Sequence, residues 1–106
     1  MQIQINTDRN VAGSEEFSGQ VKTKIEDVLN RFSKHVTRVE VHISDENSDK
    51  GGINDKRCLM EARLEGRQPI AVTHQAANLS LAIQGAVDKL KNVIESTLGR
   101  LDNHSR

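Results

Sequence analysis

Two stretches in the middle of the chain alternate apolar and polar residues, and this alternation limits the possible folds more than any other feature. In "TRVEVHIS", one side carries Val39, Val41 and Ile43. In "KRCLMEARLE", one side carries Cys58, Met60, Ala62 and Leu64. A period of two residues is typical of a β-strand with one buried and one solvated face. The intervening segment is rich in Ser, Asp, Asn and Gly, so we predict two strands joined by a long hairpin loop.

That loop, within "SDENSDKGGINDKRC", resembles a calcium-binding motif in part. Asp45, Asn47 and Asp49 fall at the first, third and fifth positions of an EF-hand loop. The sixth position requires glycine but is Lys50, and the twelfth requires a bidentate glutamate but is Lys56. Both differences remove chemistry that calcium needs. We therefore interpret the segment as a polar connection without an ion.

The cysteine and the histidines do not form a recognisable catalytic or metal site. Cys58 has neither a second Cys nor a His at ligand spacing, which favours a buried thiol in a strand. The four histidines, His35, His42, His74 and His104, are scattered without an HxxxH or Ser-His-Asp arrangement. We expect no enzyme activity, no metal and no cofactor.

Two amphipathic helices and two further strands complete the predicted architecture. The first helix is expected from a Ser14 cap through about His35, and the second from an Asn78 cap onward. "QIQIN" and "PIAVTH" supply the outer strands, the latter after a tight turn beginning at Gly66. The order β-α-β-β-β-α predicts an α+β fold: a four-stranded mixed sheet with both helices on one face. The first two strands should be parallel and the later pairs antiparallel.

Length and charge narrow the possible functions. The 106 residues suffice for one domain, which we place at residues 1–102 with a frayed tail at 103–106. Fifteen basic and fifteen acidic residues cancel, so a polyanion would have to be held by a local basic patch. The N-terminus lacks the features of a signal peptide and no apolar run is long enough to span a bilayer, which predicts a cytoplasmic protein without a membrane partner.

The order of elements and several short segments resemble the bacterial ribosome hibernation factors, which include hibernation-promoting factor and ribosome-associated inhibitor A. The matching segments are "MQIQIN", "VKTK" followed by Phe32 and Lys34, "VEVHI", "IAVTHQAANLSLAIQGAVDKL" and "NDKRCLMEARLEG". Together they cover nearly the whole chain. The resemblance implies a double-stranded-RNA-binding-domain-like fold that occupies the decoding region of the small ribosomal subunit. It further implies inhibition of translation in stress or stationary phase, and a short form without the additional C-terminal domain that pairs ribosomes.

Members of this family contact ribosomal RNA phosphates through basic side chains on both helices. The resemblance transfers this role to Lys24, Arg31, Lys34, Lys89, Lys91 and Arg100. Asp27, Asn92 and Ser96 stand where the family commonly has basic residues, so the expected footprint is thinned. Asp27 is also spaced to pair with Lys24 or Arg31. Without the resemblance, such mixed charges are typical of a solvated helix face.

A protein-binding module of the same fold is the alternative function. It would act through a sheet edge, the neutral sheet face or the 44–57 loop, and strand addition would be its physical route. The open sheet face is predicted to lack aromatic residues, which leaves no platform for base stacking. We expect a monomer or weak homodimer and no small-molecule substrate.

Overall fold

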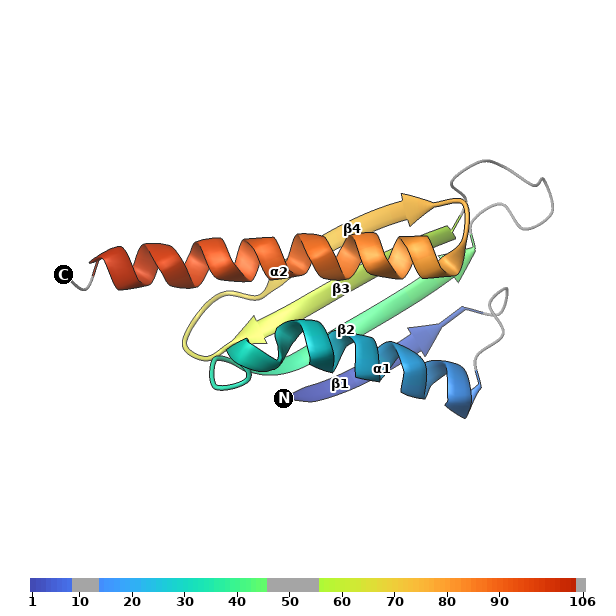
Figure 1. Cartoon of the computed structure of the whole chain (residues 1–106), viewed down its shortest axis with the longest axis horizontal. Coiled ribbons are helices and arrows are strands. Elements are labelled where there is room, and N and C mark those ends of the chain that lie inside the picture. Colours follow the sequence, from blue (N-terminus) through green and yellow to red (C-terminus); the bar gives the residue numbers. More distant parts are fainter. Residues whose placement is uncertain (9–13, 46–55, 105–106) are drawn as a thin grey trace.

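The computed structural model describes residues 1–8, 14–45 and 56–104, with side chains described as far as Gly99. Within these ranges the chain forms four strands, two long helices and a short 3-10 helix (Figure 1). In chain order these are β1 (Gln2–Thr7), α1 (Glu15–Leu29), η1 (Asn30–Phe32), β2 (Val36–Asp45), β3 (Lys56–Leu64), β4 (Ile70–Ala76) and α2 (Leu79–His104). The predicted α+β class and element order are confirmed.

The four strands form one mixed sheet in the order β1-β2-β3-β4. β1 runs parallel to β2, with Ile5 beside Val41, whereas β2–β3 and β3–β4 are antiparallel. Gly66, at the start of the β3–β4 turn, has φ of 72°, a left-handed conformation that favours glycine. Both helices lie over the same face of the sheet, as predicted (Figure 1). The predicted hairpin between β2 and β3 is present, while residues 46–55 of its loop lie outside the described part of the chain.

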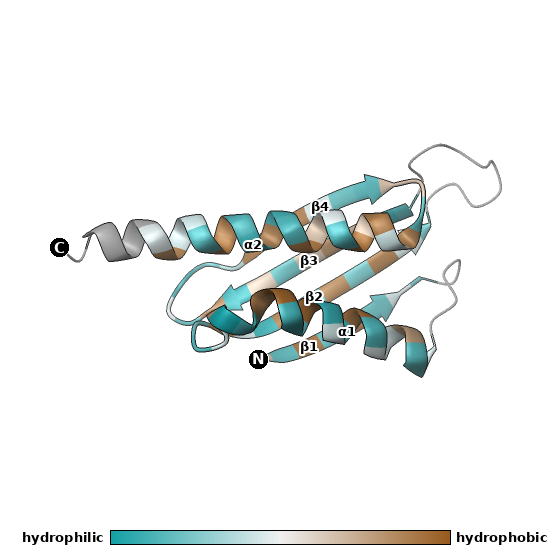
Figure 2. Ribbon diagram, in the orientation of Figure 1, coloured by the Kyte–Doolittle hydropathy of each residue, from teal (hydrophilic) through white to brown (hydrophobic). Residues whose placement is uncertain are grey.

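The alternating residues of the central strands form the core. Val39, Val41 and Met60 are completely buried beneath the helices. The helices contribute the matching apolar stripes: Val21, Ile25 and Leu29 from α1, and Ala82, Ile83, Ala86, Val87, Leu90 and Ile94 from α2. Apolar residues accordingly recur along both helices and along the strands behind them (Figure 2). Burial of each large side chain contributes roughly 1.5–3 kcal/mol, so this one layer supplies most of the stabilisation.

The first helix begins where the sequence predicts but ends earlier. The Ser14 hydroxyl oxygen accepts a hydrogen bond of 3.0 Å from the Phe17 amide, which caps the helix. The α-helix stops at Leu29 instead of continuing to about His35, and the chain tightens into η1. The His35 amide then donates to the Phe32 carbonyl (2.8 Å) before β2 starts. The tighter turn buries Phe32 while reversing the chain, a requirement that helical spacing alone does not reveal.

The second helix is long and well capped. The Asn78 side-chain oxygen accepts from the Leu81 amide at 2.9 Å, confirming the predicted cap. Its 26 residues correspond to a length of about 39 Å, and the helix extends past the end of the sheet (Figure 1). Its backbone remains helical through His104, two residues beyond the predicted domain boundary at residue 102.

One helix-to-strand contact is unusually close. A Cβ atom placed on Gly85 of α2 would lie 2.0 Å from Cδ2 and 2.4 Å from Cγ of His74 on β4. Real atoms do not approach so closely, so the imidazole occupies the space that any other residue at position 85 would need. The pair His74–Gly85 therefore sets the distance between α2 and the edge strand.

Gly85→Ala is predicted to lower stability by about 1 kcal/mol, because the roughly 1–3 kcal/mol cost of displacing the imidazole exceeds the roughly 1 kcal/mol gain in helix propensity. In a His74→Ala background the same change should stabilise by about 1 kcal/mol, since only the propensity gain remains. Urea unfolding of the four proteins of this double-mutant cycle measures both effects. Equal effects of Gly85→Ala in the two backgrounds would contradict the close packing.

Candidate nucleic-acid interface

The two helices meet along a polar seam that contains three of the predicted RNA-binding residues. At its α2 N-terminal end, the half-buried Lys24 ammonium donates a hydrogen bond of 2.5 Å to Gln84 Oε1. The Gln84 amide nitrogen in turn donates to Asp88 Oδ1 at 2.9 Å on the next turn of α2. Lys24 is thereby directed across the seam toward α2 instead of straight into solvent.

Further along the seam, one carboxylate neutralises two of the predicted cations. The Arg31 guanidinium forms an ion pair with Glu95 and lies 4.7 Å from the centroid of the Phe32 ring. The Lys91 ammonium lies 3.7 Å from the same Glu95 oxygen. The Arg31 side chain is still 60% exposed, so the pair is solvated and contributes roughly 0–1 kcal/mol.

The pairing that the spacing allows for Asp27 is not formed. Lys24 and Arg31 instead bond to Gln84 and Glu95 on the other helix, and within the described ranges Asp27 has no ion-pair partner. Spacing along one helix cannot anticipate this result, because the competing partners lie some sixty residues later in the chain. Gln84 and Glu95 are the contributors to the site that the sequence analysis missed.

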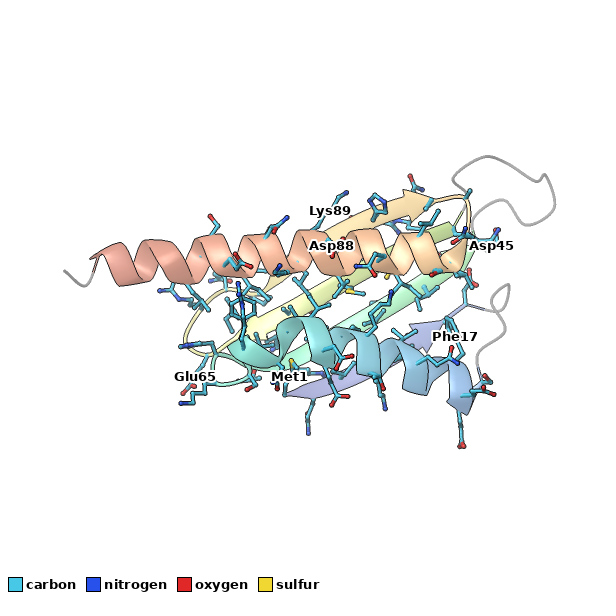
Figure 3. The ribbon with its side chains drawn as sticks, viewed as in Figure 1. Met1, Phe17, Asp45, Glu65, Asp88 and Lys89 are labelled. Carbon is cyan, nitrogen blue, oxygen red and sulfur yellow. The ribbon has the colours of Figure 1, made fainter. Side chains whose placement is uncertain are left out.

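The remaining predicted residues lie apart from the seam. Lys34 is exposed in the turn after η1. Lys89 is on the opposite side of α2 from Lys91, since two helical steps correspond to about 200°. Its ammonium reaches the sheet edge and donates to the Thr73 carbonyl oxygen at 2.8 Å (Figure 3). Arg100 lies within α2, where only the backbone is described. Lys89 and Lys91 thus lie on two sides of α2, and the five predicted residues whose side chains are described do not form one continuous patch.

The uncovered sheet face is polar and internally paired. Arg38 forms an ion pair with Glu40 (2.8 Å) and also hydrogen-bonds to Gln4. No aromatic residue stands on this face among the described strand residues, which matches the predicted composition. Leu59, half-buried opposite His42, also belongs to this face and was overlooked, although period two from Arg57 would have placed it there.

Cys58 is completely buried in the core, where reagents in solution cannot reach its thiol. Burial raises the pKa of its thiol from 9.0 to about 12, because the thiolate would lose its hydration.

Across the described ranges, no three His, Cys, Asp or Glu side chains gather closely enough to hold a metal ion. Over the same part of the chain, neither helix combines the length and apolar content needed to cross a bilayer.

Fold and surface together define a small α+β domain whose polar features lie on helix faces and sheet edges. A model of the family described as "Sigma 54 modulation protein / S30EA ribosomal protein" matches residues 3–102. The chain belongs to this family, which confirms the family predicted from the sequence. A comparison with curated proteins gives no match.

Two solved structures share the fold. The N-terminal domain of Protein Y from Thermus thermophilus superposes with a TM-score of 0.73 at 22% identity, covering 92% of this chain and 99% of that one. A ribosomal subunit interface protein from Coxiella burnetii has the same TM-score at 14% identity, covering 93% and 99%. At these identities the similarity establishes the fold and leaves side-chain roles to be argued from this chain.

The burial of Cys58 predicts a specific loss of stability in alkali. Between pH 9 and 12 the unfolded thiol releases its proton while the folded thiol keeps it, so stability falls as pH rises, by up to about 1.4 kcal/mol per pH unit. The difference in unfolding free energy between wild type and Cys58→Ala, measured in urea, should be constant below pH 9. It should shrink by about 2 kcal/mol at pH 10.5. If the difference between wild type and Cys58→Ala does not change with pH, the thiol ionises as readily in the folded protein as in the unfolded one. That result would contradict the predicted effect of burial.

Proposed function

We propose that this protein associates with the ribosome, binding the small subunit through ribosomal RNA and inhibiting translation in stress or stationary phase. The observation that carries the proposal is the family match across residues 3–102. The similarity to the Coxiella burnetii ribosomal subunit interface protein supports the same partner. The protein acts in the cytoplasm by occupying a site on the small ribosomal subunit, and it catalyses no reaction.

The helix seam gives this proposal a physical route. Lys24, Arg31 and Lys91 lie along it and are held by an amide and one carboxylate. RNA phosphates would replace Gln84 and Glu95 as acceptors. At Glu95 the exchange is inexpensive, because an exposed ion pair contributes roughly 0–1 kcal/mol. Each phosphate neutralised also releases condensed counterions, which provides the driving force in a chain with no net charge.

A protein-binding role is the second candidate, and the sheet edges favour it. β1 and β4 are the edge strands of the sheet. Lys89 covers the Thr73 carbonyl on β4, which hinders strand addition there and leaves β1 as the better edge for a partner strand. Such a partner would be another protein or a second copy of this chain in a weak homodimer, and its binding should depend little on the helix cations.

Co-sedimentation with purified small ribosomal subunits across a salt series tests the proposal. We expect wild-type protein to pellet at low salt, with log affinity falling by roughly 0.9 per contacted phosphate for each tenfold increase in salt concentration. A variant with four of the predicted contact residues reversed should not pellet: Lys24→Glu, Arg31→Glu, Lys34→Glu and Lys89→Glu.

A second variant with the same change in charge controls for net charge. It reverses four cations away from the seam: Lys22→Glu, Arg38→Glu, Arg63→Glu and Arg67→Glu. This control should retain most of the binding, because its reversed residues lie outside the six predicted contacts. If neither wild type nor control pellets even at low salt, the protein-binding function replaces the ribosomal one.

Glu95→Gln is predicted to strengthen small-subunit binding by up to about fivefold, because it frees Arg31 and Lys91 from a competing carboxylate worth up to about 1 kcal/mol. The salt dependence should become steeper as well. Glu65→Gln removes the same charge from an exposed position at the end of β3 and should change affinity much less. Competition by Glu95 would be refuted by equal affinities of the two variants, measured by the same sedimentation assay.

A further inference from the structure

A hollow at the outer edge of the sheet brings together an arginine, a histidine and a lysine from three elements. It lies where β4 borders α2 and is lined by Arg57, Thr73, His74, Gln75 and Lys89. Four of these residues were given no function in the sequence analysis. Among the described residues that line it there is no Asp or Glu, although the chain as a whole carries as many acidic as basic residues. This local composition favours an anionic ligand.

Lys89 is held at the rim of the hollow by the backbone. Its ammonium donates to the Thr73 carbonyl at 2.8 Å, which orients a side chain that would otherwise be flexible (Figure 3). An ammonium has three N–H donors, and the carbonyl uses one of them. Two donors and a full positive charge therefore remain for a ligand in the hollow.

His74 is fixed by its packing against α2. The ring edge formed by Cγ, Cδ2 and Nε2 is the one nearest Gly85, so Nδ1 lies on the edge directed away from the helix backbone. Nδ1 carries an N–H in one neutral tautomer and in the imidazolium, so it can donate to an anion in both of these forms. The close approach at Gly85 thus places a donor in the wall of the hollow and restricts its movement.

Arg57 forms the third side of the hollow from the neighbouring strand. It lies opposite Gln75 in the β3–β4 ladder. A guanidinium presents several N–H groups in a planar fork that matches two oxygens of one oxyanion. Donors on three sides suit a tetrahedral group with several acceptor oxygens better than a planar carboxylate.

We propose that Arg57, His74 and Lys89 form a binding site for a phosphate group, and that its ligand is a backbone phosphodiester of the bound RNA. The proposal deepens the ribosomal function above and rests on it for the identity of the ligand. The hollow opens at the sheet edge, where a continuous RNA strand can pass, and it lies on the side of α2 opposite the seam. It would give the protein a second line of phosphate contacts that compensates for the thinned footprint on the helices.

The test is an NMR titration of the ¹⁵N-labelled full chain with sodium phosphate, compared with sodium chloride at matched ionic strength. We expect saturable shift changes at Thr73, His74, Gly85 and Lys89 that chloride does not produce. Uridylyl-uridine, which carries one phosphodiester, should perturb the same resonances. Phosphate that causes no localised change would overturn the site, whatever the protein does with ribosomes.

Three variants and one control make the titration specific. His74→Ala and Lys89→Gln should each weaken phosphate binding at least fivefold. Gly85→Ala should also weaken it, because the new methyl group displaces the imidazole without changing any charge. Lys22→Gln removes a cation of α1 that lies beside β1, at the other edge of the sheet, and should bind as wild type does. Unchanged binding in all three variants would also refute the site, provided that circular dichroism shows them folded.

Comparison with the sedimentation assay separates this proposal from the function on which it rests. Protein that pellets with small subunits but shows no localised phosphate shifts retains its proposed function and lacks the site. Protein that shows the shifts with both probes but never pellets has the site without the ribosomal function. Shifts with inorganic phosphate alone would mean that the hollow takes free phosphate, and the RNA assignment would be wrong.

Discussion

The sheet has one apolar face, and the structure depends on covering it. Alternation along β2 and β3 gathers Val39, Val41, Cys58 and Met60 on a single side, where all four are completely buried. A sheet with one dry face is stable only when other elements exclude water from that face. The helices α1 and α2 do so together and therefore lie side by side over this face, while the opposite, polar face stays uncovered (Figure 1).

This packing also determines where the basic residues can act. Because the apolar stripes of the helices face the sheet, their flanking polar residues meet along the seam, where Lys24 contacts Gln84 and Arg31 contacts Glu95. In the proposed function, these seam cations would contact RNA by exchanging their internal acceptors for phosphates. Binding strength should therefore depend on the acceptors as much as on the number of basic residues, and Glu95 limits it most directly.

The contact between α2 and the edge strand β4 shows that a single glycine can shape a surface. Gly85 permits the His74 ring to lie against the helix, and the same contact holds the imidazole beside Lys89 in the hollow. A larger residue at position 85 would separate helix and strand or expel the ring. The glycine reduces helix propensity by about 1 kcal/mol relative to alanine, and its structural effect lies in this close approach.

The strands, the helices, their order and the caps at Ser14 and Asn78 could be predicted from the amino-acid sequence, because they follow from local periodicity and local hydrogen bonds. The sequence also placed Cys58 in the core and indicated the family. The end of α1 could not be predicted in this way, since it is set by tertiary packing, which buries Phe32 while the chain turns into β2. The partners of Lys24 and Arg31 and the contact between His74 and Gly85 are likewise set by tertiary packing. Those contacts join residues that belong to different elements, so they depend on how the helices are placed on the sheet, which no single segment encodes.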